Sequence, residues 1–247
     1  MTPTIRLLPI ADADGPTNMA RDEALLVTAA DHGVASLRFY TWSEPTLTLG
    51  YFQPAASRTE NAALAILPWL RRATGGAAIV HHHELTYALA LPASRVYQPP
   101  GESWICRIHH MVQAILREHG LIAHGVVCGE EAKLGDVLCF LHQTPADLTI
   151  NGSKVAGSAQ RKLRGALLQH GSLLLARSTS APDLPGINDA AGRELFTPKS
   201  LADLISQRFV SETGWVSDST QWRDDEHANT QRILKEKYGS VEWNERR

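Results

Sequence analysis

The 247-residue chain contains 24 lysines and arginines and 26 aspartates and glutamates, which gives a formal net charge of −2. This balance gives no basis for binding nucleic acid or an anionic membrane surface, and 43% hydrophobic residues is ordinary for a globular protein. Three cysteines without metal-type spacing, no signal-peptide pattern and no bilayer-spanning apolar run favour a reduced, cytoplasmic protein.

Hydrophobic periodicity and turn residues divide the first half of the chain into short strands and helices. Thr17 is the predicted N-cap of the first helix, and Gly33 and Gly120 follow the ends of two helices. In chain order, the predicted elements are a strand at residues 5–10, a helix at 18–30, strands at 36–42 and 46–51, a short helix at 61–67, strands from 68 and over 77–81 and 85–91, a helix at 103–118 and a strand at 121–127.

Some side chains in these segments are candidates for the core. Tyr51 and Phe52 follow a strand, where aromatic residues either line a pocket or, more often, belong to the core. Cys106 lies within an amphipathic helix and is predicted to be a small core residue. The strand at 85–91, LTYALAL, is almost entirely apolar and is therefore predicted to be buried.

An arginine pair, Arg71 and Arg72, precedes a turn formed by Ala73, Thr74, Gly75 and Gly76. The backbone amides of such a turn can meet an anionic group. The turn is neither a P-loop nor a Rossmann fingerprint, because the required glycine and lysine spacing is missing. The residues alone leave each arginine open as an anion ligand or a surface charge.

The run His81-His82-His83-Glu84 suggests a zinc site. In a strand, successive side chains point to opposite faces, so only His81 and His83 would share a metal. The sequence has no cysteine or carboxylate pair at zinc-finger spacing and no HExxH helix. We therefore expect no metal site.

The stretch from Asp147 to Leu175 reads as consecutive strands joined by tight turns. Asn151-Gly152 predicts a type I′ hairpin, because such a turn needs positive φ at both central residues. Lys154 follows this turn and is either solvated, as most lysines are, or reaches a carbonyl or phosphoryl oxygen. The next strand leaves room for a ligand or another backbone at its small residues, which are Gly157, Ser158 and Ala159.

Cys139 lies between a loop at residues 128–136 and this hairpin. One interpretation is a buried structural thiol. The other is a nucleophile, which requires the thiolate form, and a nearby lysine cation favours that form. Cys139 and Lys154 are close enough in the chain to meet, although the residues alone do not show that they do.

The C-terminal part begins with a proline-rich connection after Arg177 and continues with predicted helices at 198–209 and 221–238. It has too few apolar positions for a core of its own. We therefore expect residues 178–247 to pack on the main domain.

Three co-linear motifs carry a resemblance to a known family. They are RFYTWSEPTLTLGYFQ at residues 38–53, RRATGGAAIVHHHELTYAL at 71–89 and NGSKVAGSAQRKLRGALLQHGSLLL at 151–175. In order and spacing they resemble the biotin/lipoate ligase superfamily, in its lipoate ligase A-like branch. The resemblance implies an α+β fold with a mixed central sheet flanked by helices, related to the class II aminoacyl-tRNA synthetase core. It implies one catalytic domain over residues 1–247, with its core at 18–177.

Members of this family attach a lipoyl or octanoyl group to a lysine of a carrier domain, and two branches differ in chemistry. Ligases use ATP and Mg to form lipoyl-AMP, whereas octanoyltransferases use a cysteine thioester and need no cofactor. Cys139-Phe140 and the words ELTYA and QHGSLLL are similar to the cysteine-dependent octanoyltransferases. The resemblance therefore favours an acyltransferase of lipoate assembly, with the ATP-dependent ligase as the alternative.

The resemblance also assigns roles to residues. Cys139 and Lys154 would be catalytic, with the oxyanion met by Lys154 or by backbone amides near Gly157-Ser158. The acyl chain would lie against the Gly75-Gly76 turn, and Arg71 or Arg72 would position a phosphopantetheine or a nucleotide phosphate. The substrate-binding residues would be Arg71, Arg72, Thr74, Gly75, Gly76, His81, Gly157, Ser158, Ala159 and His170.

The implied partners are acyl carrier protein and lipoyl carrier domains, such as the glycine cleavage H protein and dehydrogenase E2 domains. A third possibility is a non-catalytic acyl- or carrier-binding protein, although Lys154 argues against it because an apolar-chain binder needs no such charge. Biotin ligation is disfavoured because the GRGRxGR-type loop is missing. Two positions depart from the family pattern: Ala77 replaces a glycine or larger residue, and Ala88 replaces a common serine.

Overall fold

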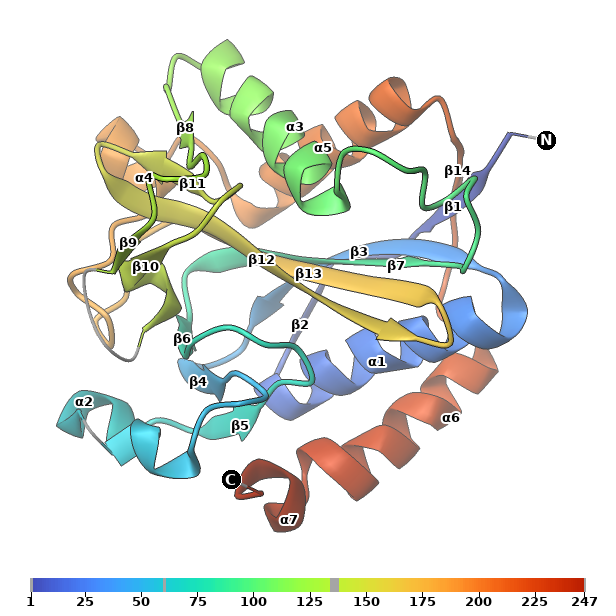
Figure 1. Cartoon of the computed structure of the whole chain (residues 1–247), viewed down its shortest axis with the longest axis horizontal. Helices are drawn as coiled ribbons and strands as arrows, with labels where there is room; N and C mark the ends of the chain where they lie inside the picture. The colour runs from blue at the N-terminus through green and yellow to red at the C-terminus, as the bar shows by residue number, and fades with distance from the viewer. Residues whose placement is uncertain (1, 60, 134–137, 247) are drawn as a thin grey trace.

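A large mixed β-sheet forms the centre of the computed structural model, which describes residues 2–59, 61–133 and 138–246 (Figure 1). Its strands run in the order β14-β1-β3-β7-β13-β12-β11-β8, with β2 added beside β3. Pairing is parallel at β14-β1, β1-β3 and β2-β3 and antiparallel from β3 to β8. The strands are β1 (Thr4–Leu7), β2 (Ala11–Ala13), β3 (Ala35–Trp42), β7 (Glu84–Leu91), β8 (His124–Gly125), β11 (Leu148–Ile150), β12 (Ser153–Leu163), β13 (Ala166–Leu174) and β14 (Val216–Ser219).

Helices cover both faces of this sheet (Figure 1). On one face lie α3 (Trp104–Glu118) and α5 (Pro198–Thr213), and on the other lie α1 (Gly15–His32) and α6 (Asp224–Ile233). Each interface holds its own apolar cluster. Every residue of β7 is buried, as predicted from its largely apolar sequence, because helices cover this strand on both faces. The predicted α+β class with a mixed, helix-flanked sheet is confirmed.

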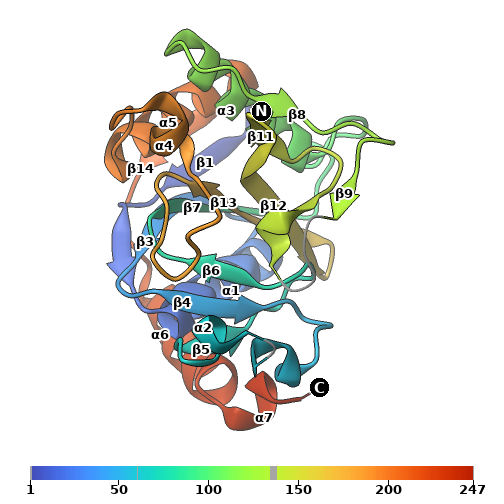
Figure 2. The same ribbon diagram turned by 90° about the vertical axis from the view of Figure 1, so that its left-hand side faces the viewer.

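A smaller sheet lies beside the large one, in the order β5-β4-β6 (Figure 2). Its strands are β4 (Thr46–Leu49), β5 (Trp69–Arg71) and β6 (Ile79–His81). The short helix α2 (Ala62–Ala65) precedes β5 and begins at the cap Asn61. A two-stranded ribbon joins β9 (Ala132–Lys133) to β10 (His142–Gln143).

The C-terminal part contacts both faces and one edge of the large sheet. Strand β14 pairs with β1, α5 packs against α3, and α6 packs against α1. Arg6 on β1 and Glu226 on α6 form a buried ion pair at 2.6 Å. The remaining helical segments are α4 (Ile187–Ala191), a π-helical turn at Leu234–Tyr238 and α7 (Val241–Asn244).

The predicted hairpin is confirmed. Asn151 has φ 50° and Gly152 has φ 80°, and they connect β11 to β12 with Ile150 opposite Ser153. The helix predicted at 103–118 is confirmed as α3, and Ser103 caps it, since its side chain accepts from the Cys106 N–H. Local sequence signals therefore determine these elements.

Several boundaries differ from prediction. The first helix begins at Gly15, because Asp14, not Thr17, accepts the capping hydrogen bond. The strand predicted at 121–127 shrinks to two exposed residues, His124 and Gly125. The strands predicted on either side of the Ser43-Glu44-Pro45 turn enter different sheets, since β3 joins the large sheet and β4 the small one.

Some predicted core residues are not in the core. Phe52 is 69% exposed, and Tyr51 is half-buried near the C-terminal segment. Cys106 is half-buried rather than a core residue. Part of the predicted 128–136 loop, with Val137, lies outside the described residues. No helix among the described residues has the length and apolar character needed to cross a bilayer.

Candidate active site

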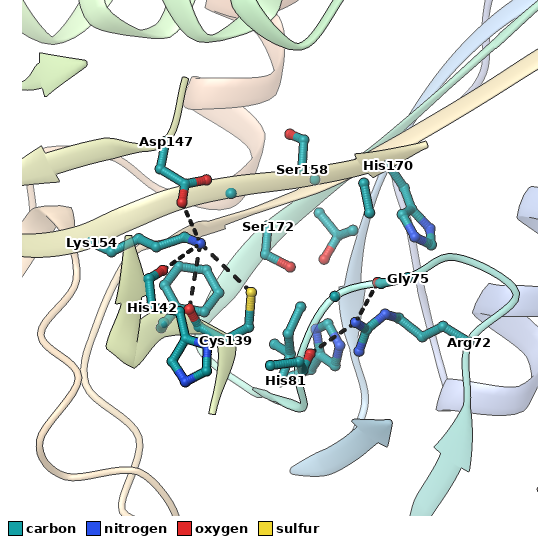
Figure 3. A pocket seen from close by; sticks show the side chains of 18 of the residues that line it. Arg72, Gly75, His81, Cys139, His142, Asp147, Lys154, Ser158, His170 and Ser172 are labelled. Atoms are coloured by element: carbon teal, nitrogen blue, oxygen red, sulfur yellow. Dashed lines mark hydrogen bonds and ion pairs between the residues drawn. The ribbon is translucent and has the colours of Figure 1, made fainter. Parts of the chain in front are cut away.

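A cavity of about 220 Å³ lies where the small sheet meets β12 and β13 (Figure 3). The Gly75–Ala77 turn and Ile79 line one side, and Gly157, Ala159 and His170 line another. Cys139 and Lys154 lie together at its edge. The structure therefore brings together residues that are far apart in the chain.

Lys154 is only 3% exposed, so the solvated interpretation is wrong. Its Nζ lies 2.7 Å from Asp147 Oδ2 and donates to the His142 carbonyl at 3.1 Å. It also lies 3.4 Å from the Cys139 carbonyl oxygen and 3.6 Å from Cys139 Sγ (Figure 3). An ammonium group has three protons, so the third is shared between the Cys139 oxygen and sulfur.

Cys139 starts a short 3₁₀-helix, Cys139–Leu141, and its thiol is half-buried. The Cys139 N–H donates to the Ala78 carbonyl at 2.6 Å, and Leu138 forms a β-bridge with Ala78. These contacts attach the cysteine to the segment that follows the Gly75-Gly76 turn. A cation at hydrogen-bond distance from sulfur favours a thiolate, which is the reactive form.

Asp147 belongs to this site, although the sequence analysis did not select it. Its carboxylate accepts from the Thr144 N–H at 2.7 Å, from the Thr144 hydroxyl at 2.9 Å and from Lys154. Its side chain is nearly fully buried. One sequence feature could have identified Asp147: this acidic residue and Lys154 lie on the two arms of one tight hairpin, and paired strands bring opposite side chains together.

Comparison with known proteins agrees with this geometry. Residues 14–189 match the family model of the lipoyl protein ligase A/B catalytic domain. The chain belongs to this family. It is 31% identical over 270 residues to an octanoyltransferase LipM of Brevibacillus brevis, covering 96% of this chain and 98% of that one. A LipM of Carboxydothermus hydrogenoformans is 30% identical over 272 residues, covering 97% and 98%.

Solved structures of the same fold are more distant in sequence. A putative lipoate protein ligase from T. acidophilum with bound lipoic acid superposes with TM-score 0.74 at 19% identity, covering 100% of both chains. A lipoate-protein ligase A bound with ATP gives 0.73 at 19% identity, covering 99% of both. These similarities establish the fold of the lipoyl protein ligase A/B catalytic domain in this chain.

Both arginines of the motif are buried, so neither is a surface charge. Burial lowers the pKa of Arg72 to about 10, which leaves it cationic at neutral pH. Its Nη1 donates to the carbonyl and hydroxyl oxygens of Thr48, and its Nη2 donates to the carbonyls of Gly75 and Ala77. In this member of the family, Arg72 therefore shapes the turn that lines the cavity.

Arg71 lies away from the cavity lining. Its guanidinium donates to the carbonyls of Gly50, Gln53 and Asn244, and its N–H donates to Asn244 Oδ1. These bonds tie the loop after β4 to the C-terminal segment. The structure thus gives Arg71 a structural environment, in contrast to the substrate contact expected from the motif.

Ser158 lines the cavity with its backbone but not with its hydroxyl. Figure 3 shows its side chain pointing away from Cys139 and Lys154, whereas Ser172 points toward them. The register explains the difference, since Gly157 pairs with Ser172 and Ser158 with Gly171, and successive residues face opposite sides. Gly157 and Ala159 lie on the cavity side.

His170 faces the cavity between two polar side chains. Its Nδ1 lies 3.0 Å from Asp22 Oδ2, and its Nε2 lies 2.7 Å from the Thr74 hydroxyl. Because a carboxylate only accepts, Nδ1 carries a proton and its ring orientation is fixed. Thr74 itself lies behind His170 rather than among the cavity-lining residues.

His81 lines the cavity and belongs to a buried network under it. Burial lowers the pKa of His81, so the ring is neutral; its Nδ1–H donates to Glu84 Oε1 at 2.8 Å. Its Nε2 lies 2.8 Å from the Thr48 hydroxyl, which is the group that Arg72 contacts. The Trp42 ring stacks on His81 at 3.8 Å between ring centroids.

Glu84 lies at the centre of this network and accepts hydrogen bonds from three side chains. The sequence analysis did not select it as a residue that supports the site. Burial alone would raise its pKa, but donors from His81, Thr86 and Ser172 hold the pKa of Glu84 below its ordinary value of 4.5. Its contribution to stability is therefore complete above about pH 4.5 and is lost as pH falls further.

We predict that Glu84→Gln lowers the free energy of unfolding at pH 7 by about 2–3 kcal/mol, because an amide accepts these hydrogen bonds more weakly than a carboxylate. The difference from wild type should shrink when urea unfolding is repeated below pH 4.5. The exposed Glu194→Gln is the matched control and should have no effect at either pH. An equal loss at both pH values would contradict the assignment of a charged Glu84.

Among the described residues, no group of three or more histidine, cysteine or acidic side chains is arranged to hold a metal ion. His82 and His83 stack on each other at 3.6 Å between centroids, and His81 is engaged with Glu84.

Proposed function

We propose that this protein is an octanoyl (or lipoyl) transferase, which carries the acyl group on Cys139 and delivers it to a lysine of a lipoyl carrier domain. The observation that carries the proposal is the 3.6 Å contact between Cys139 Sγ and Lys154 Nζ at the edge of the cavity. The full-length relatives named octanoyltransferase LipM support it.

In the first half-reaction, the Cys139 thiolate attacks the carbonyl carbon of an acyl thioester, and a carbon–sulfur bond forms. The carbonyl oxygen becomes an oxyanion, which the buried Lys154 ammonium or nearby backbone amides would stabilise. The bond to the donor sulfur then breaks, and the donor leaves as a thiolate that takes a proton. The acyl group remains on Cys139 as a thioester.

In the second half-reaction, the neutral amine of the carrier lysine attacks the acyl carbon. The carbon–nitrogen bond forms, the bond to Cys139 breaks, and the nitrogen loses one proton to give an amide. The sulfur returns to the side of Lys154 as a thiolate. These two half-reactions involve no net redox change and need no nucleotide, because the acyl group of a thioester is already activated.

The cavity suits a short apolar chain. Ala77, Ile79, Met19 and Phe140 give it apolar surface, and the glycines at the turn leave space. Its volume of about 220 Å³ is smaller than that of pockets for drug-sized ligands, which starts at about 300 Å³, and so fits a small ligand. We propose that the chain of an octanoyl or lipoyl group lies between the Gly75–Ala77 turn and β12.

The alternative is an ATP-dependent ligase, and two observations favour the transferase over it. Among described residues lining the cavity, the only carboxylate is Asp147, which is ion-paired with Lys154 rather than available for Mg²⁺. All four Nη protons of Arg72 are engaged with protein oxygens, so they are not offered to a phosphate. The similarity to the ATP-bound ligase, at 19% identity, concerns the fold and does not support ATP use by this chain.

The proposed partners are an acyl carrier protein or acylated carrier domain as donor, and an apo lipoyl domain, of a glycine cleavage H protein or a dehydrogenase E2, as acceptor. We propose that residues 1–247 act as one catalytic domain in the cytoplasm. A non-catalytic acyl-binding protein would have no use for the buried Lys154 beside a thiol, since burying a lysine costs free energy.

The test is intact mass after mixing the protein with octanoyl-acyl carrier protein without ATP, beside Cys139→Ala. We expect a covalent octanoyl adduct that requires Cys139 and that an apo lipoyl domain discharges. Acylation of the lipoyl domain only from free octanoate and ATP would instead indicate a ligase. Bound octanoate with neither adduct nor transfer would indicate a binding protein.

A further inference from the structure

His109 lies on the far side of β12 from the cavity. It belongs to α3, is only 1% exposed, and joins two groups with its two ring nitrogens. Its Nδ1 lies 2.5 Å from the Ala146 carbonyl oxygen, and its Nε2 lies 2.8 Å from Ser158 Oγ. The acyl-transfer steps above do not use this side chain.

The hydrogen bonds around His109 have one consistent direction. A carbonyl only accepts, so Nδ1 carries the proton and the neutral Nε2 accepts from the Ser158 hydroxyl. The Ser158 oxygen then accepts from the Tyr87 hydroxyl at 2.7 Å, and the Tyr87 oxygen accepts from Gln169 Nε2 at 2.6 Å. This chain of donors from β13 and β7 therefore ends on the Ala146 carbonyl.

Ala146 is the residue immediately before Asp147, and its backbone is unusual. Its φ is +76°, in a region that residues with a Cβ seldom occupy. The surrounding turn is held by bonds from the Ala146 N–H to Val126 and from the Asp147 N–H to Thr144. Such a conformation persists only where its surroundings hold it, and His109 contributes the bond to the carbonyl.

We propose that His109 is a positioning residue for the acyl-transfer reaction: through the Ala146 carbonyl it holds Asp147 against Lys154 and so keeps the Lys154 ammonium beside Cys139. The inference rests on the proposed function for its consequence on turnover. The placement of Lys154 beside the thiol can be tested without any acyl substrate.

Neutral His109 suits this role. Burial lowers its pKa, and the charged or titratable groups nearby are Asp147 and Lys154 on the hairpin, His110 on its own helix and Tyr87 on β7. At neutral pH the ring therefore remains a donor at Nδ1 and an acceptor at Nε2, and the direction of the chain does not change.

Two substitutions of His109 test the contacts of its two ring nitrogens separately. His109→Asn places an amide N–H near the position of Nδ1 and can keep the bond to Ala146, whereas His109→Gln reaches the position of Nε2 and keeps only the Ser158 side. We expect the asparagine variant to acylate Cys139 close to the wild-type rate. We expect the glutamine variant to be slower by about 10²-fold, the usual cost of a small misplacement near the reacting groups.

The second readout is the rate of Cys139 alkylation by iodoacetamide against pH, followed by peptide mass to separate it from Cys106 and Cys128. In His109→Gln the profile should move toward that of Lys154→Met, because the thiolate loses its cation. In His109→Asn it should stay with wild type. Partial unfolding would also expose the half-buried Cys106 to the reagent, so an unchanged alkylation rate at Cys106 shows that the change at Cys139 belongs to the folded protein.

Equal effects of the two variants, or an unchanged alkylation profile in folded His109→Gln, would overturn the proposal. If glutamine prevents folding, the asparagine variant decides alone: a folded protein with slow acylation and a shifted profile overturns the proposal. If wild type forms no acyl adduct, the proposed function fails, but the alkylation profiles still test His109.

Discussion

Lys154→Met should slow acylation of Cys139 by octanoyl-acyl carrier protein by about 10³-fold, as expected when a preorganised cation is removed from an oxyanion and its nucleophile. Methionine keeps the length and apolar stem of lysine but has no proton to donate to the acyl oxygen or the sulfur. The measurement is single-turnover acylation, quenched in acid and read as intact mass.

Stability must be measured beside this rate, because the substitution leaves a buried Asp147 carboxylate without its cation. Breaking such a pair costs about 3–5 kcal/mol. The double variant Lys154→Met/Asp147→Asn removes the uncompensated charge and should recover stability but not the acylation rate. Lys162→Met, an exposed lysine on the same strand, is the matched control. Wild-type acylation in folded Lys154→Met would exclude a catalytic Lys154.

Gly157→Ala should reduce acylation by about 10²-fold while leaving the fold intact. A Cβ at Gly157 would lie 2.6 Å from Lys154 Cε, 3.0 Å from its Nζ and 3.3 Å from Asp147 Oδ1. The first two atoms are the far end of a flexible side chain, so the ammonium can move away instead of the strand. The substitution should therefore slow catalysis and lower the melting temperature by less than Lys154→Met does, because the ion pair with Asp147 is displaced and not removed.

Gly125→Ala is the matched control for this substitution. Gly125 is also a strand glycine, on β8, and a Cβ there would meet no atom within 4 Å. It should keep the wild-type acylation rate. If Gly157→Ala also acylates at that rate, the position of Lys154 in the folded protein is not critical; a large fall in melting temperature would show that the strand moved instead.

Local signals in the sequence were sufficient for much of the fold. Asn151-Gly152 predicted its own turn, because few residues tolerate positive φ at two consecutive positions. The apolar run at 85–91 predicted a buried strand, and the helical spacing of apolar residues over 103–118 predicted α3. The motif resemblance then supplied the class of fold and the pairing of Cys139 with Lys154.

The rest depends on contacts that local sequence does not encode. The residues alone left Arg71 and Arg72 open as anion ligands or surface charges. In the fold both are buried, and their guanidinium groups donate to backbone carbonyls, of Gly50 and Gln53 for Arg71 and of Thr48 and Gly75 for Arg72. The sequence did not distinguish His109 from the other residues of α3. Its role depends on the contact with the Ala146 carbonyl, which only the tertiary fold creates. The side of the sheet to which Ser158 points depends on the strand register, because a shift of one residue turns every side chain to the opposite face.

The pairing of β1 with β14 has a consequence for synthesis of the chain. Thr4 lies beside Val216, and Arg6 finds its carboxylate only at Glu226. Until residues 216–226 have left the ribosome, β1 has one edge of unpaired amides and carbonyls, and Arg6 has no carboxylate partner. A nascent chain at that stage is open to pairing with a foreign strand. Strand β14 therefore covers this edge of β1 only after residues 8–215 have been synthesised.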